Sequence, residues 1–117
     1  MPRLALLFAL LIATPAAAFD RVTNRTAFLT LISDKTLSNR LYQISLTVSP
    51  SGVITGEALG WDVTGNWTWK NGFFCRDMTW GGDALPYNCQ LVETRDNREL
   101  RFTSDQGQGE SASFKLR

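Results

Sequence analysis

Residues 61–89 read WDVTGNWTWKNGFFCRDMTWGGDALPYNC, and this stretch decides the fold. It contains all four tryptophans and both cysteines of the 117-residue chain. At its centre, Asn71-Gly72 is the dipeptide favoured in a two-residue type I′ turn, where both central residues need a positive φ. Aromatic, strand-like sequence lies on both sides of this dipeptide, so we predict an antiparallel hairpin around it.

The hairpin determines which side chains share a face of the sheet. With Asn71-Gly72 as the loop, Trp69 lies opposite Phe74 and Trp67 lies opposite Arg76, and directly opposed residues share a face. We therefore expect one inner, mostly aromatic face. Its predicted members are Trp67, Trp69, Phe74, Arg76, Met78 and Trp80. Cys75 is expected on the other, more polar face.

The first 18 residues have the three parts of a secretory signal peptide. Arg3 precedes an apolar run from Leu4 to Ala13, and Ala16-Ala17-Ala18 fits the small-x-small cleavage pattern. The run is too short to cross a bilayer as a helix. We therefore predict cleavage after Ala18, a periplasmic or secreted protein, and no transmembrane segment in the mature chain.

Residues 19–117 fit a single domain with a modest core. The chain has 12 basic and 11 acidic side chains, and removal of Arg3 makes the two numbers equal. Without a basic field, nucleic acid is not an expected partner. Export to an oxidising compartment predicts a disulfide between Cys75 and Cys89, with two buried free thiols or a redox-active pair as the alternatives.

The rest of the chain predicts one helix followed by strands. Val22 to Ser33 has the spacing of a short amphipathic helix, with Thr23 as its cap. After Asp34, alternating apolar and polar residues predict further strands, and Gly81–Pro86 is expected to be a loop. These strands are predicted at 36–37, 41–48, 53–59, 87–94, 99–103 and 111–116. The expected fold class is mainly β: a small antiparallel up-and-down barrel or curved meander of about seven strands, with one short helix after the signal peptide.

The residue types argue against catalysis. The chain has no histidine, which removes the usual general base, the usual catalytic triads and the commonest zinc ligand. Asp62, Asp77 and Asp83 could meet as paired acids or as calcium ligands, but solvated carboxylates at strand ends are the simpler interpretation. We expect no catalytic residue, no metal and no cofactor.

Arg76 is the residue that most suggests a function, because it is predicted beside Trp67, Trp69 and Phe74. A guanidinium held among aromatic rings is either a structural cation-π brace or the group that binds an anion in an aromatic-lined cavity. We favour the brace, since small barrels are usually filled by their own side chains.

Three short motifs resemble those of a family of short secreted bacterial proteins. The motifs are G-x-W-x-W at Gly65–Trp69, F-C-R at Phe74–Arg76 and N-C-Q at Asn88–Gln90. Some members of that family carry the name dihydrodipicolinate reductase. The genuine enzyme needs a nucleotide-binding domain, whereas the G-x-G-x-x-A match in this chain, Gly107–Ala112, is too close to the C-terminus for the strand and ribose-binding acid that must follow. The resemblance therefore implies no activity.

Two functions of different class remain open. The first is a non-catalytic interaction module that binds a protein or an envelope component, with Trp80, Asp83 and Tyr87 around the expected loop as candidate contact residues. The alternative is a carrier of a small ligand in an aromatic-lined cavity near Arg76. A reductase is a further alternative that rests on the family name alone.

Overall fold

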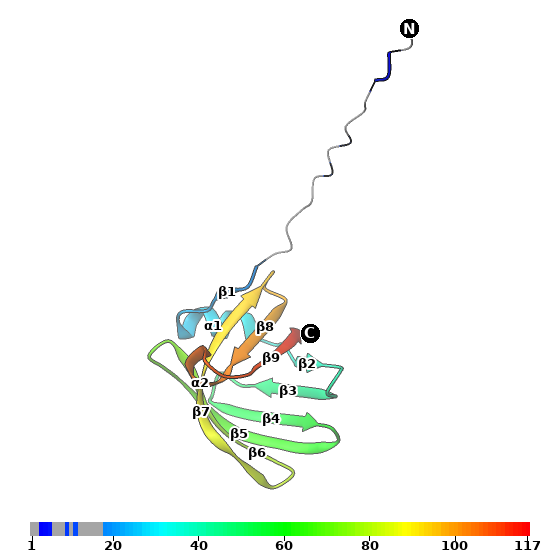
Figure 1. Ribbon diagram of the computed structural model, residues 1–117. Coiled ribbons are helices and arrows are strands. Elements are labelled where there is room, and N and C mark those ends of the chain that lie inside the picture. Colours follow the sequence, from blue (N-terminus) through cyan, green and yellow to red (C-terminus); the bar gives the residue numbers. More distant parts are fainter. Residues whose placement is uncertain (1–2, 6–8, 10, 12–17) are drawn as a thin grey trace.

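A computed structural model describes residues 3–5, 9, 11 and 18–117 (Figure 1). Twelve of the 18 residues of the predicted signal peptide therefore lie outside the described residues. The described chain is mainly β, as predicted, and contains nine strands and two short helices.

Eight of the strands form a closed barrel of up-and-down topology, which confirms the predicted fold class. Each strand pairs antiparallel with the next along the chain, and the last returns to pair with the first. The barrel strands are β2 (Leu37–Asn39), β3 (Ile44–Val48), β4 (Val53–Ala58), β5 (Trp61–Lys70), β6 (Phe73–Trp80), β7 (Asp83–Arg95), β8 (Glu99–Thr103) and β9 (Ser111–Leu116). A ninth strand that was not predicted, β1 (Asp20–Arg21), adds to the outside of β7.

The central hairpin has the predicted turn and the predicted register. Asn71 and Gly72 both have a positive φ, 52° and 83°, as a type I′ turn requires. Trp69 pairs with Phe74 and Trp67 pairs with Arg76. A two-residue turn leaves no freedom of register, which is why the local sequence was sufficient to predict the pairing.

The loop predicted at Gly81–Pro86 is wrong, because β7 already begins at Asp83. Gly81 and Gly82 alone make the turn, with φ of 57° and 86°. Pro86 had indicated a break in the strand. It lies instead at a β-bulge, where the register between β6 and β7 shifts, and a bulge tolerates the missing backbone N–H of proline.

The helix is shorter than predicted and has a different cap. It spans α1 (Arg25–Ile32), and its N-cap is Asn24, whose side chain accepts a hydrogen bond of 2.8 Å from the backbone N–H of Ala27. Thr23, the predicted cap, lies one residue too early for this bond. The strand predicted at residues 41–48 begins three residues later than expected. Residues 40–43 form a turn, and β3 begins at Ile44.

Helix α1 closes one end of the barrel with its two buried residues, Phe28 and Ile32. Phe28 is fully buried, and its ring centroid lies 5.2–6.4 Å from the ring centroids of four barrel residues. We refer to these five residues as the aromatic cluster: Phe28, Trp67, Trp69, Phe74 and Phe102. The barrel end beneath α1 is therefore filled by the protein's own side chains.

Candidate functional site

The end of the barrel opposite α1 is hollow. A pocket of about 280 Å³ opens there, which we call the mouth pocket. All ten of its lining residues are aliphatic or aromatic. They are Tyr42, Ile44, Leu46, Ala58, Leu59, Val63, Met78, Trp80, Leu85 and Phe114. Their positions show that the pocket lies among the turns β2–β3, β4–β5 and the start of β7, at the far end of the barrel from the aromatic cluster.

Exposed apolar side chains surround this opening. Leu41 and Tyr42 lie on the β2–β3 turn and are 82% and 56% exposed. Leu59 lies on the β4–β5 turn and Trp61 follows it, and they are 50% and 62% exposed. We call these four residues the apolar rim. Large apolar groups gathered at one edge of a small domain are typical of a surface that meets another molecule.

A smaller inner cavity of about 90 Å³ lies deeper in the barrel. Leu46, Met78 and Phe114 line both the inner cavity and the mouth pocket, so the two hollows are neighbours. Eight of the residues that line the inner cavity are apolar, and the two polar ones are Arg76 and Gln90. Both polar side chains therefore face an otherwise apolar interior.

Arg76 is held at the inner cavity by the bulge in β7. Across the bulge Arg76 pairs with Asn88, whereas Met78 pairs with Leu85, so β7 carries one residue more than β6 between these two pairs. The Nη1 atom of Arg76 donates a hydrogen bond of 2.7 Å to the carbonyl oxygen of Pro86, within the bulge. A bulge commonly redirects local groups in this way.

The Arg76 guanidinium is not fully satisfied. Its Nε atom is buried and has no hydrogen-bond partner. Burial lowers the pKa of Arg76 below its ordinary value, and the carboxylate of Asp77 acts in the opposite direction. An arginine nevertheless keeps its charge at neutral pH. The site thus presents a positive charge and a free donor within the barrel wall.

The tryptophans predicted to surround Arg76 have other contacts. In the part of the chain that the structure describes, the cation over the Trp67 ring is Arg25, at 5.6 Å, and Arg76 makes no cation-π contact. The Trp67 indole N–H donates to the carbonyl oxygen of Ser49 at 2.8 Å. Trp67 and Trp69 belong to the aromatic cluster and do not line either hollow, whereas Phe74 lines the inner cavity. The predicted brace is not observed, and the predicted aromatic-lined cavity is lined mainly by aliphatic residues.

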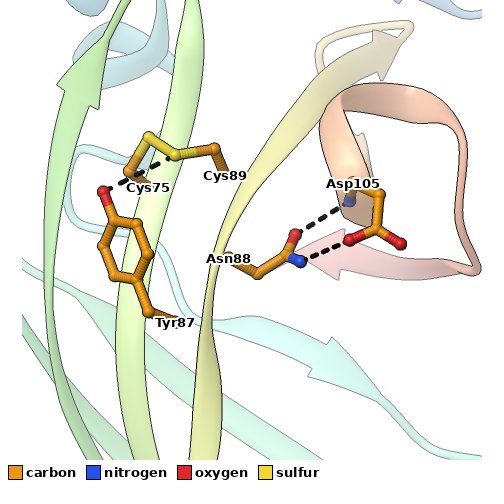
Figure 2. The surroundings of a disulfide bond; sticks show 5 residues. All are labelled: Cys75, Tyr87, Asn88, Cys89 and Asp105. Carbon is orange, nitrogen blue, oxygen red and sulfur yellow. Dashed lines mark hydrogen bonds between the residues drawn. A yellow bond between two sulfur atoms is a disulfide. The ribbon is translucent and has the colours of Figure 1, made fainter.

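The predicted disulfide is present on the outer wall beside the bulge (Figure 2). Cys75 and Cys89 face each other directly on β6 and β7. The Tyr87 hydroxyl lies 3.6 Å from Cys89 Sγ, and it is the donor because a disulfide sulfur carries no hydrogen. The Cys75–Cys89 pair is next to the Arg76–Asn88 pair, so the covalent link fixes the strand pair that positions Arg76.

Asn88 connects the same segment to the β8–β9 connection. The short turn α2 (Ser104–Gly107) contains two residues, Asp105 and Gln106, with a positive φ of 54° and 55°. Asn88 Nδ2 donates to Asp105 Oδ1 at 2.7 Å, and the Asp105 backbone N–H donates to Asn88 Oδ1 at 2.9 Å (Figure 2). This reciprocal pair compensates for the unusual backbone of Asp105.

Of the three residues of the predicted interaction loop, Trp80 and Asp83 line one small pocket, and Tyr87 is not part of its lining. Trp80 ends β6, lines the mouth pocket and donates from its indole N–H to the carbonyl oxygen of Ala58 at 2.8 Å. Asp83 pairs with Trp80 across the turn and is exposed. Tyr87, which is 60% exposed, lies on the outer wall at the disulfide. Because the expected loop is a strand, these side chains are spread over a hairpin.

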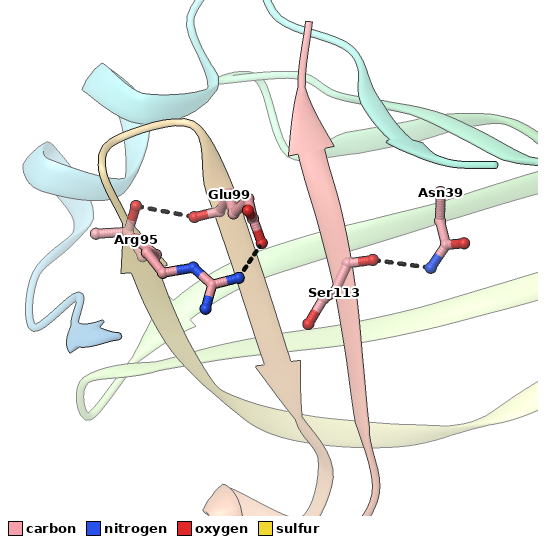
Figure 3. A network of polar contacts seen from close by, with 5 residues as sticks. Asn39, Arg95, Glu99 and Ser113 are labelled. Carbon is pink, nitrogen blue, oxygen red and sulfur yellow. Dashed lines mark hydrogen bonds and ion pairs between the residues drawn. The ribbon is translucent and has the colours of Figure 1, made fainter. Parts of the chain in front are cut away.

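A third hollow, of about 240 Å³, lies on the outer wall and is polar. Arg40, Lys115 and Arg117 contribute to it, and so does Glu99, whose carboxylate already forms an ion pair of 2.9 Å with Arg95. Figure 3 shows this pair and the hydrogen bond of 2.9 Å from Asn39 Nδ2 to the Ser113 carbonyl oxygen. The ion pair links β7 to β8, and the hydrogen bond links β2 to β9, where the barrel closes.

Comparison with family models, with curated proteins and with solved structures finds no match to this chain. Within the described residues, no group of three or more His, Cys, Asp or Glu side chains could hold a metal ion. No helix of that part of the chain is long and apolar enough to cross a membrane. The candidate site is therefore defined by its geometry.

Sequence reasoning missed most of the mouth pocket and also missed Gln90. A signal for Gln90 was present. Pairing of Cys75 with Cys89 places Gln90 opposite Phe74 and hence on the inner face. By contrast, Tyr42, Leu59 and Leu85 come together only because three turns meet at one end of the closed barrel, and no local pattern indicates that.

Proposed function

We propose that this protein is an exported, non-catalytic binding protein that carries a small apolar molecule in the mouth pocket. The observation that carries the proposal is an opening of about 280 Å³ whose ten lining residues are all aliphatic or aromatic. Ligand pockets are typically concave, mostly apolar and formed before the ligand arrives. Burial of an apolar ligand there releases water from both surfaces, which is favourable in proportion to the area buried.

The volume of the mouth pocket limits the size of the ligand, and the filled end of the barrel limits its route of entry. Ligand pockets usually span roughly 300–1,000 Å³. The mouth pocket, at about 280 Å³, is just below this range, which favours a short alkyl chain or a small ring system. The aromatic cluster blocks the opposite end, so the ligand enters and leaves on the side of the apolar rim.

Two observations support the exported location. The N-terminal sequence has the pattern of a cleaved signal peptide. A disulfide such as Cys75–Cys89 is compatible with an oxidising compartment outside the cytoplasm. Mass spectrometry of the protein recovered from a host that secretes it tests this part, and we expect the mature chain to begin at Phe19.

Binding of a neutral dye tests the carrier function directly. We expect N-phenyl-1-naphthylamine to gain fluorescence with the wild-type protein and decan-1-ol to displace it. Ala58 lines the mouth pocket, so Ala58→Trp should fill the pocket and weaken dye binding at least tenfold. Thr47→Trp is the matched control, because Thr47 is exposed on β3 outside the barrel. Equal dye binding by the two variants would contradict the proposal.

A second candidate is an interaction module that binds a protein or envelope component through the apolar rim. The exposure of Leu41 and Trp61, 82% and 62%, favours it. If this function is the correct one, wild-type protein should capture the same component repeatedly from an envelope extract, and a Leu41→Ser, Trp61→Ser double variant should lose it. Capture that the double variant retains would exclude the rim as the contact surface.

A further inference from the structure

We propose that the ligand carries a carboxylate, or an anionic group of similar size, and that Arg76 and Gln90 bind this group in the inner cavity. The inference rests on the proposed carrier function and identifies the chemical class of ligand for the same site. The apolar part of such a ligand would occupy the mouth pocket, and its charged group would point into the barrel.

The first argument is that Arg76 lacks a partner of opposite charge. The two ion pairs found among the described residues are Arg95–Glu99 and Arg101–Glu93. Asp77 is next to Arg76 in the chain, but it is exposed and lies on the other face of β6. A charge that is withdrawn from water is costly unless it is paired. A bound anion would supply the missing charge.

The second argument is the unused hydrogen-bonding capacity around the inner cavity. Arg76 Nη1 is committed to the Pro86 carbonyl oxygen, whereas Nε is buried without a partner. Gln90 Nε2 donates one long bond, 3.4 Å, to Ser104 Oγ, and an amide nitrogen has a second hydrogen. A carboxylate can accept from several such donors, and charge-assisted bonds of this kind are the strong ones.

The third argument is that the cavity has the right size and position. A water molecule occupies about 30 Å³ in the liquid, so a cavity of about 90 Å³ has room for a group of two or three heavy atoms. Leu46, Met78 and Phe114 border both hollows, so an alkyl chain in the mouth pocket can place its end group at Arg76 without leaving apolar surroundings. The two sites together fit an amphipathic molecule with a small anionic end.

Three ligands of equal chain length distinguish the contribution of the anionic group to binding from that of the alkyl chain. We expect decanoate to bind wild-type protein at least tenfold more tightly than decan-1-ol, and decylammonium to bind more weakly than either, as measured by isothermal titration calorimetry. Equal affinities for decanoate and decan-1-ol would overturn the inference and leave the carrier function standing. Failure of all three to bind would overturn the carrier function itself.

A pair of variants then assigns the anion to Arg76. Arg76→Met removes the charge with little change in length, and it should abolish the preference for decanoate while it changes the affinity for decan-1-ol by less than threefold. Arg98→Met is the control, because Arg98 is exposed on the β7–β8 turn and its loss changes the net charge equally. An equal effect of both variants would mean that the preference is a long-range charge effect, which would overturn the assignment.

A direct readout on the wild-type protein does not depend on any variant. Decanoate labelled with ¹³C at the carboxyl carbon should show a bound carboxyl resonance that stays ionised to lower pH than the free acid, since a nearby cation stabilises the carboxylate. Gln90→Leu should weaken decanoate binding about threefold to tenfold. A bound carboxyl that titrates like the free acid would show that the group remains in water, contrary to the inference.

Discussion

Arg76 on β6 donates a hydrogen bond of 2.7 Å to the carbonyl oxygen of Pro86, at the point where β7 contains one more residue than β6. The bond links the residue with the most functional interest to a local irregularity of the sheet. Proline lacks the N–H that a regular ladder would use, and the bulge turns its carbonyl group toward Arg76. The position of the guanidinium is thus a consequence of the bulge.

Replacement of Arg76 should cost little stability. Arg76 is half-buried, its Nε is buried without a partner, and burial lowers its pKa in the folded state, so folding opposes the charged form. Because the folded-state pKa lies below the unfolded one, this cost is present in full at neutral pH, begins to fall as the pH rises through the folded-state value, and is gone above the unfolded-state value. Arg76→Met would remove this cost, but it would also remove the hydrogen bond to Pro86, which contributes about 1 kcal/mol. We expect the free energy of unfolding of Arg76→Met to lie within about 1 kcal/mol of wild type in urea titrations at neutral pH. A loss as large as that from a core truncation would show that Arg76 is a structural residue.

The cap of α1 should be Asn24 and not Thr23. Removal of an N-cap side chain costs about 1 kcal/mol, because one backbone N–H of the first turn loses its partner. We expect Asn24→Ala to lower the free energy of unfolding by about this amount and Thr23→Ala to have a much smaller effect. The reverse order, measured by chemical denaturation, would be inconsistent with the bond from Ala27 to Asn24.

Truncation of Phe28 should be the most damaging single change in the helix. Its ring is fully buried against four aromatic rings of the barrel. A Phe→Ala change in such a site costs about 3–5 kcal/mol through lost burial and the cavity that remains. Thr26→Ala, at an exposed position of the same helix, is the control. Similar melting temperatures for the two variants would contradict the role of Phe28 in closing the barrel.

Loss of the disulfide should destabilise the protein without changing its fold. The link between Cys75 and Cys89 closes a loop of about 15 residues, which stabilises the folded state by about 3 kcal/mol in the loop-entropy model. The Cys75→Ala, Cys89→Ala double variant should lose about this much and keep the far-ultraviolet circular dichroism of the wild type. Reduction of the wild-type protein should give a comparable loss, and a fully unfolded reduced protein would show that the barrel depends on the link for its formation.

Features governed by neighbouring residues were predictable from the sequence. The Asn71-Gly72 turn, the opposition of Trp67 to Arg76 and the pairing of Cys75 with Cys89 follow from turn chemistry and strand alternation. The number of strands and the short connections between them predicted an up-and-down topology, but they did not decide between a closed barrel and a curved meander.

Features that depend on the meeting of distant segments were not predictable. The cation over Trp67 comes from Arg25 on the helix, which no pattern around Trp67 indicates. Pro86 indicated a loop by its composition, whereas the actual strand accommodates it because a bulge forms opposite Asp77. The mouth pocket requires three turns to meet, and its lining residues are spread from Tyr42 to Phe114.

Strand β7 pairs with different numbers of neighbouring strands along its length, so its two ends should differ in how easily their backbone hydrogen bonds open. In the described chain, residues 83–85 and 88–90 pair with β6 alone, residues 91–95 pair with β8, and residues 93–94 pair with β1 as well. Backbone amides with fewer bonded neighbours open at a lower free energy. Hydrogen–deuterium exchange should therefore be fast near Ala84 and slow near Val92, within one continuous strand. The wall beside the mouth pocket would then open locally, while the end of the barrel that Phe28 fills remains closed.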